Sequence, residues 1–414
     1  MKKVDFDRGT ITHNILQTAF PMLVAQVLNL LYSIVDRVYI GRIPGAGTEA
    51  LGAVGLCFPV IILVTGFTNM FGLGGAPLFS MALGQGNREK AIDIQNTALR
   101  LLVLVGAAIL LVGELLGDRI LLLFGATMGE LSLALPYLRI YLVGTIFIMV
   151  STGMNAYINA QGFPVVGMIS VTIGAASNLI LDPLFIFGLK LGVSGAAIAT
   201  VLSQLLSFLF VLTFLFGKRN ELPVCFAWRF PYAGAIMSLG LAPFIMQVTN
   251  SLVQIACNSV LMQYGGAVFV SIMTIVSSVR SILDVPVMAI TDGASPSISY
   301  NYGAGRLQNV RKAIRVMMAL ALPYTVVVWA LVMAVPQIFV RIFSEDAAIS
   351  EGASRALHLY FCAFVFQSFQ YSGQTVFKAL NKKGNAIFFS LFRKVILVVP
   401  LTFLLPAAAG LGPD

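Results

Sequence analysis

The stretch GAPLFSMALGQGNREKA, residues 75–91, returns later in the chain as GASPSISYNYGAGRLQNVRKA, residues 293–313. A second pair lies at the same offset of roughly 220 residues: AFPMLVAQVLN (19–29) resembles LAPFIMQVTN (241–250), and each has a proline at its third position. Glycines, prolines and charged loop residues recur in the same order in both copies. We therefore interpret the chain as two related halves.

The composition predicts a protein that lies mostly inside a lipid bilayer. Of the 414 residues, 58% are hydrophobic and 10% are charged, and the mean hydropathy is +0.91. Soluble domains carry about 25% charged residues, so this chain has too few charges to cover a soluble surface. The net charge of +9 is spread over short loops between apolar runs, which is typical of membrane topology rather than of nucleic-acid binding.

Apolar runs long enough to cross a membrane predict an all-α membrane protein with two pseudo-symmetric six-helix bundles. We expect the first bundle in residues 1–220 and the second in residues 221–414. The second half ends one span short, and we expect the absent twelfth helix to reflect truncation. The predicted spans, about eleven in number, are residues 14–40, 50–72, 94–116, 133–159, 164–187, 193–216, 236–262, 267–290, 315–339, 356–379 and 385–408.

The distribution of lysine and arginine predicts the orientation of these spans. The N-terminus and alternate loops hold most of the basic residues, among them Lys2, Lys3, Arg8, Arg88 and Lys90. Cytoplasmic loops carry such an excess, so we expect the N-terminus in the cytoplasm and the protein in the cytoplasmic membrane.

A polar stripe runs through the first predicted span. Gln26, Asn29, Ser33 and Asp36 are spaced by three, four and three residues, so they share one face of a helix. An acid among apolar walls costs about 2.5–3.5 kcal/mol on insertion scales and is usually functional. Pro21, in the same span, predicts a bend that occupancy of the acid could alter.

The fifth and sixth spans carry oxygen-bearing side chains at a matching depth. Asn178 and Asp182 lie on one face of the fifth span, and Thr200 lies in the sixth. Counted from the outer end of each span at ~1.5 Å per residue, Asp182 and Thr200 lie at the same depth as Asp36 to within one helical turn. We predict a cation site that binds a proton or Na⁺ at Asp36, Asn178, Asp182 and Thr200.

Each of these residues also has a simpler interpretation. Asp182 precedes Pro183 and could cap or kink a helix. Asp36 precedes Arg37 and could form a local pair with it at the membrane interface. Thr200 could serve only helix packing. Their agreement in depth favours the shared site.

The second half has amide stripes in place of acids. The position that matches Asp36 is Cys257 or Asn258. Arg280 and Asp284, four residues apart, predict an ion pair whose role is structural or in gating. The other amides could line a substrate cavity or join helices by hydrogen bonds. Together with Gln26, Asn29 and Ser33, the substrate-cavity candidates are Gln247, Asn250, Gln254, Gln367, Gln370 and Gln374.

Several segments carry a resemblance to a known family. LLYSIVDRVYIG (30–41), the turn ALGQGN (82–87) and NLILDPLFIFG (178–188), with LGVSGAAIAT (191–200) after it, are similar to the multidrug and toxic compound extrusion family. With Asp36 but no acid in the seventh span, the chain resembles the DinF-like or a related prokaryotic branch. The family's N-lobe cation site maps onto the four residues that the depth comparison had selected.

The resemblance implies an antiporter that exports lipophilic, often cationic compounds by alternating access, driven by H⁺ or Na⁺. We expect a monomer that needs no cofactor or further metal and binds small molecules, not nucleic acid. A flippase for lipid-linked precursors and a passive channel are the alternatives. We expect no enzymatic activity, because the spans hold no nucleophile–base pair or cluster of His, Asp and Glu.

Overall fold

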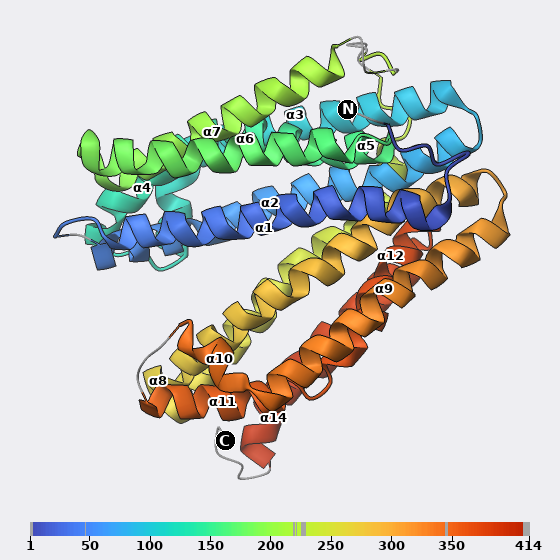
Figure 1. Ribbon diagram of the computed structural model, residues 1–414. Helices are drawn as coiled ribbons and strands as arrows, with labels where there is room; N and C mark the ends of the chain where they lie inside the picture. Colours follow the sequence, from blue (N-terminus) through green and yellow to red (C-terminus); the bar gives the residue numbers. More distant parts are fainter. Residues whose placement is uncertain are drawn as a thin grey trace.

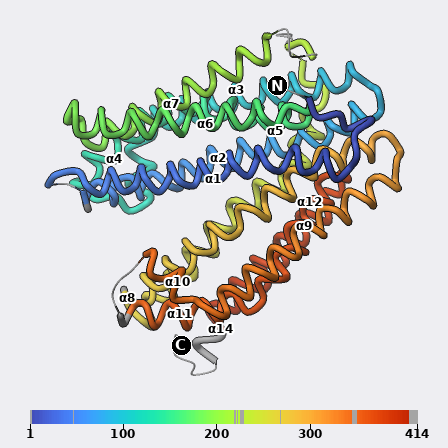
Figure 2. The backbone as a smooth tube through the Cα atoms, viewed as in Figure 1, coloured from blue at the N-terminus to red at the C-terminus, as the bar shows by residue number. Residues whose placement is uncertain are grey.

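The computed structural model describes residues 3–45, 47–217, 220, 222–224, 229–343 and 347–408. All regular elements in this part of the chain are helices, and they form two groups (Figure 1). We name the group from α1 to α7 the N-lobe and the group from α8 to α14 the C-lobe. The two lobes meet at the end that holds the N-terminus and diverge toward the other end, which gives the molecule a V shape (Figure 2).

The N-lobe helices begin and end where the sequence supplies caps and breaks. Thr127 and Glu130 form a reciprocal capping box at the start of α4. Pro164 occupies the first turn of α6, where its missing N–H costs no hydrogen bond. The elements are α1 (Ile11–Gly41), α2 (Gly47–Gly84), α3 (Arg88–Leu123), α4 (Met128–Val143), α5 (Thr145–Ala160), α6 (Pro164–Pro183), the π-helix η1 (Leu184–Gly188) and α7 (Gly192–Leu215).

The C-lobe opens with α8 (Ala233–Gly303), which is two helices joined at a sharp break. Gly266 has φ 63° and ψ −161° there, a backbone conformation that only glycine adopts readily. The remaining elements are α9 (Leu307–Ala334), α10 (Pro336–Arg341), α11 (Ala347–Phe361), the 3₁₀ turn η2 (Phe364–Phe366), α12 (Gln367–Ala379), α13 (Lys383–Leu391), the π-helix η3 (Phe392–Val398) and α14 (Val399–Ala408).

The described helices largely match the predicted spans. Nine are long and apolar enough to cross a membrane, and the bent pair α4–α5 would make a tenth. The predicted span 356–379 differs, because η2 interrupts it between α11 and α12. Residue 221, where we predict that the second bundle begins, lies outside the described residues, so the boundary between the bundles stays a prediction.

Large apolar side chains cover much of the outside of the helices. Phe20, Leu115 and Leu359 are each more than two-thirds exposed. On a soluble protein such a surface would be a liability, whereas hydrocarbon solvates it. The chain is therefore a multi-pass membrane protein.

Glycines bring the two lobes into backbone contact where they meet. A Cβ atom on Gly240 of α8 would overlap the carbonyl oxygen of Met70 of α2, and one on Gly303 would overlap that of Met81. Gly74 of α2 faces Gly240 in return. Small residues at such crossings let helix backbones approach closely in a membrane. The α2–α8 contact is therefore one of the contacts that hold the closed end of the V together.

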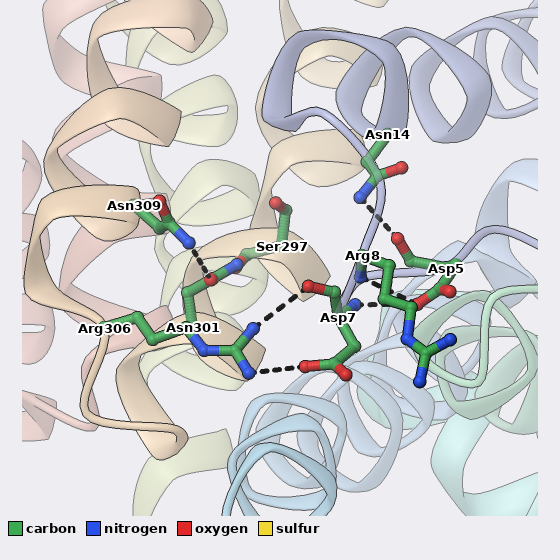
Figure 3. A network of polar contacts seen from close by, with 8 residues as sticks. All are labelled: Asp5, Asp7, Arg8, Asn14, Ser297, Asn301, Arg306 and Asn309. Atoms are coloured by element: carbon green, nitrogen blue, oxygen red, sulfur yellow. Dashed lines mark hydrogen bonds and ion pairs between the residues drawn. The ribbon is translucent and has the colours of Figure 1, made fainter.

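The segment before α1 links both lobes at this same end. The Val4 N–H donates to the Gly162 carbonyl of the N-lobe, at 2.8 Å. Arg306, just before α9, pairs with the Asp7 carboxylate at 2.6 Å and with its carbonyl oxygen at 3.0 Å (Figure 3). The N–H groups of Asp7 and Arg8 donate to the Asp5 carboxylate, which lowers the pKa of Asp5.

We predict that Gly240→Ala destabilises the closed end of the V. The added methyl group meets a carbonyl oxygen of α2, and a backbone atom cannot move aside as a flexible side chain can. Overpacking of this kind costs about 1–3 kcal/mol. Thermal unfolding in detergent should occur at a lower temperature than for the control Gly234→Ala, because Gly234 on the same helix has open space around it. Equal unfolding temperatures would contradict the prediction.

Arg306→Gln should favour conformations in which the lobes separate at this end. The ion pair with Asp7 is exposed and worth at most about 1 kcal/mol, so the ratio of conformers should change by no more than about fivefold. Distances between spin labels on the α2–α3 and α8–α9 turns would report the shift. Arg355→Gln breaks a similar 2.6 Å pair within α11 and serves as the control. If both variants change the label-to-label distances equally, the Arg306–Asp7 pair does not link the lobes specifically.

Candidate functional site

Two acids from different helices face one another inside the N-lobe. Asp36 comes from the last third of α1, and Asp182 comes from the end of α6. Their carboxyl groups are close enough to share a hydrogen bond. Asp182 is 1% exposed. Facing acids repel one another when both are charged, and a proton or cation between them removes that repulsion.

The predicted amide and hydroxyl lie beside these acids. The Asn178 side-chain N–H group donates to Asp182 Oδ1 at 3.1 Å and to Thr200 Oγ1 at 3.5 Å. Asp36 Oδ1 and Asp182 Oδ2 are buried, and no described donor reaches them. The structure thus brings all four predicted residues together from α1, α6 and α7, and it leaves two acid oxygens free to take up a cation.

A cavity of about 80 Å³ adjoins the acid pair between α1, α5, α6 and α7. Polar side chains bond one another at its wall: Ser207 Oγ donates to the Ser170 carbonyl at 2.9 Å, and Asn155 donates to Ser170 Oγ at 3.4 Å. The cavity can therefore hold water or a small ion next to the acids. Its lining includes Asn29, Tyr32, Ser151, Thr152, Asn155, Gly174, Asn178, Thr200, Ser203, Gln204 and Ser207.

The structure argues against a local Asp36–Arg37 pair and against a helix cap at Asp182, whereas the change from α-helix to π-helix directly after Pro183 agrees with the kink interpretation. The Arg37 guanidinium lies 5.1 Å from the ring centre of Phe58 on α2, and no ion pair joins it to Asp36 among the described residues. Asp182 does not cap a helix end, because the backbone continues from Pro183 into the π-helix η1. Pro21 is buried, and α1 runs through it without interruption.

Two tyrosines near the acids, Tyr32 and Tyr137, and a third that stacks on Tyr137 were missed by the sequence analysis. Tyr32 lines the cavity and lies within electrostatic range of both acids. Tyr137 and Tyr141 on α4 are almost fully buried, and their rings stack 6.3 Å apart. Tyr32 stands four residues before Asp36, one helical turn away, and this spacing could have identified it. The α4 pair could not be found, because its approach to α1 depends on the packing of the bundle.

The polar residues of α1 before Asp36 do not all line the same cavity. Asn29 lines the N-lobe cavity. Gln26 instead lies close to Asp292 of α8, which borders a cavity of about 50 Å³ together with Lys378. Ser33 is half-buried, outside the described lining of the N-lobe cavity.

The amides of the C-lobe do not converge as one set. Gln254 bonds Asn258 at 3.3 Å within α8, and Gln374 donates to the Ala386 carbonyl at 3.4 Å, which joins α12 to α13. Gln367 lies close to Asp284, and Gln370 Oε1 is buried without a described partner. Gln247 is half-buried and Asn250 is exposed. Helix-to-helix bonding thus explains Gln374, and a substrate role for the other amides stays a prediction.

The position that corresponds to the acid pair in the C-lobe is neutral. Cys257 Sγ of α8 lies 3.9 Å from Thr402 Oγ1 of α14. At the repeat's offset of roughly 220 residues, Asp36 corresponds to Cys257 or Asn258, and Asp182 corresponds to a position near Thr402. The second half therefore has uncharged side chains at this place.

The predicted ion pair of α8 is present in the C-lobe. Arg280 Nε donates to Asp284 Oδ2 at 3.2 Å, and the Tyr371 hydroxyl donates to the same oxygen at 3.1 Å. Arg280 also bonds the hydroxyl of Tyr360. Asp284 is 6% exposed, so these donors compensate an acid in the interior of the lobe.

Two helical lobes that meet at one end, with an ionisable site inside one of them, define the architecture of a secondary transporter. The chain matches the MatE family over residues 21–184 and 243–404. It therefore belongs to that family of transporters, the multidrug and toxic compound extrusion family that its sequence resembles.

Individual transporters are similar to this chain in sequence and in structure. The multidrug export protein MepA of Staphylococcus aureus (strain MRSA252) is 24% identical over 411 residues, covering 98% of this chain and 90% of MepA. An outward-facing multidrug resistance MATE transporter of the MOP superfamily has a TM-score of 0.92 at 23% identity, covering 100% of this chain and 92% of its own. A MOP superfamily transporter from Pyrococcus furiosus Vc1, for which reverse polarity of the binding pocket suggests a different function, has a TM-score of 0.91 at 24% identity with the same coverage.

Asn178→Leu should destabilise the N-lobe, because Asp182 loses its donor and a buried acceptor without a partner costs about 1–3 kcal/mol. Thermal unfolding in detergent should occur at a lower temperature than for the wild type. Asn29→Leu, the same substitution at an exposed position on the same cavity, should change the unfolding temperature little. An equal loss in both variants would show that the bond to Asp182 contributes nothing of its own.

Proposed function

We propose that this protein is a cation-coupled antiporter that exports lipophilic, often cationic small molecules across the cytoplasmic membrane. The observation that carries the proposal is the facing pair Asp36 and Asp182, which lies in spanning helices beside a small polar cavity. The similarity to MepA, a multidrug export protein, supports the substrate class. The excess of basic residues near the N-terminus supports a cytoplasmic N-terminus.

The coupling follows from the electrostatics of the pair. With no cation bound, two charged carboxylates repel across α1 and α6, which favours a conformation that lets water reach them. A proton or Na⁺ cancels the repulsion, and Asn178 and Thr200 supply further oxygen atoms. The pair then stabilises a closed, cation-loaded state in which the substrate is released outside. Return of the cation to the inside completes the alternating cycle.

The membrane potential can supply the required energy. One charge crossing 100 mV yields about 2.3 kcal/mol, which sustains a concentration ratio of about fiftyfold. One cation per cycle is therefore sufficient for useful export.

The deciding experiment is substrate transport in proteoliposomes, first under an imposed pH gradient and then under an imposed Na⁺ gradient. Tetraphenylphosphonium, a lipophilic cation, is a suitable probe. We expect one of the gradients to drive its transport, and Asp36→Asn and Asp182→Asn each to lower the gradient-driven rate at least tenfold. Asp93→Asn, at an exposed acid near the start of α3, is the matched control.

Three outcomes would contradict the proposal. Unchanged gradient-driven transport in Asp36→Asn would remove the acid pair from the mechanism. Flux that does not saturate with substrate and needs no counter-ion would indicate a passive channel. Transport of a lipid-linked precursor without gradient dependence would indicate a flippase.

A further inference from the structure

Three basic side chains lie together at mid-membrane depth inside the C-lobe. Arg393 and Lys394 are the eleventh and twelfth residues of the 22-residue spanning helix Lys383–Leu404. Arg280 lies on the spanning part of α8, Val268–Gly303. The fields of Arg280 and Arg393 both act on the Lys394 ammonium. Cations this far from either membrane surface are costly unless they bind something.

Asp284 is the acid that acts on the two arginines of this cluster. Asp284 is already bonded to Arg280 and to the Tyr371 hydroxyl. Lys394 is 5% exposed, and its ammonium donates to the Met246 carbonyl at 2.9 Å. Arg393 has no ion pair among the described residues. Arg280 and Arg393 against Asp284 leave one positive charge in excess, and the Lys394 ammonium adds a second when it is protonated.

The local backbone supports a functional rather than a purely structural cluster. Arg393 and Lys394 lie within η3, a π-helical turn, and such turns occur frequently at functional sites. The Arg280 side chain is 35% exposed and Tyr360 beside it is 38% exposed. A guanidinium at this depth is costly against hydrocarbon, so the exposed part of Arg280 needs water or a ligand as its partner.

The two lobes thus have interiors of opposite sign. The N-lobe holds Asp36 and Asp182, whereas the C-lobe cluster holds more cations than acids. Guanidinium groups match the planar geometry of carboxylate and phosphate oxygens. A ligand with an oxyanion group would supply the counter-charge that the C-lobe lacks.

We propose that Arg280, Arg393 and Lys394 form an anion-binding site that takes the carboxylate or phosphate group of a transported amphiphile. This rests on the proposed export function and extends it: the substrates include anionic or zwitterionic amphiphiles in addition to lipophilic cations. Arg393 is the residue most available to the ligand, because Arg280 is engaged with Asp284 and Lys394 with Met246.

Binding can be measured without transport by using amphiphiles with one tail and different headgroups. Dodecyl phosphate, dodecylphosphocholine and dodecyltrimethylammonium are titrated into the purified protein in a non-ionic detergent, and thermal unfolding reports occupancy. We expect dodecyl phosphate to stabilise the wild type at the lowest concentration and dodecyltrimethylammonium at the highest. Arg393→Gln should weaken dodecyl phosphate binding at least tenfold, and Arg393→Lys should weaken it less.

Control variants separate this site from general effects of charge and from cation coupling. Arg355→Gln removes an exposed arginine of the same lobe and should leave dodecyl phosphate binding unchanged. Asp93→Asn should also leave it unchanged, because that exposed acid lies in the other lobe and outside the acid pair. If dodecyl phosphate binds at this site but no ion gradient drives transport, the anion site is upheld and the export mechanism is rejected. If a gradient drives transport but dodecyl phosphate does not bind at this site, the export mechanism is upheld and the anion site is rejected.

Two results would overturn the proposal. Equal binding of dodecyl phosphate and dodecyltrimethylammonium, or unchanged affinity in Arg393→Gln, would show that the cluster does not bind anions. If phosphatidylglycerol competes for the site and proteoliposomes do not transport dodecyl phosphate, the site holds a resident lipid headgroup and not a transported group.

Discussion

The carboxyl groups of Asp36 and Asp182 face one another in an interior that offers them one amide and one hydroxyl as polar partners. Like charges at such short range cannot both persist in a medium of low dielectric constant. The state of the pair therefore depends on whether a proton or cation is bound. Since the acids belong to α1 and α6, that binding state also sets how firmly the two helices hold together.

The contacts at the closed end of the V determine how a change at the acid pair could move the two lobes. Glycines of α2 and α8 place backbone against backbone, and the segment before α1 joins both lobes through Gly162 and Arg306. Backbone-to-backbone contacts of this kind are closely packed, so movement of one lobe there is passed directly to the other. A change at the acid pair can then become a change in the angle between the lobes.

Sequence patterns predicted the helical class, the internal repeat and the residues of the acid pair, because each depends on spacing along a single helix or between adjacent helices. Asp36, Asn178, Asp182 and Thr200 could be grouped by counting residues from the helix ends. Tyr137, Tyr141 and the gathering of Arg393 with Arg280 could not be found in this way, because they depend on how distant helices rotate against one another. The break between α11 and α12 was also missed, since apolar composition continues through it.

The π-helical turns η1 and η3 place an extra residue into otherwise regular helices. An α-helix advances about 100° per residue, so deleting one residue from a regular turn rotates every side chain beyond it by more than a quarter of a circle. Deleting the extra residue of η3 would instead leave a regular α-helix whose faces beyond the turn keep their direction. A one-residue deletion should therefore be tolerated better within η3 than in the regular turns on either side of it.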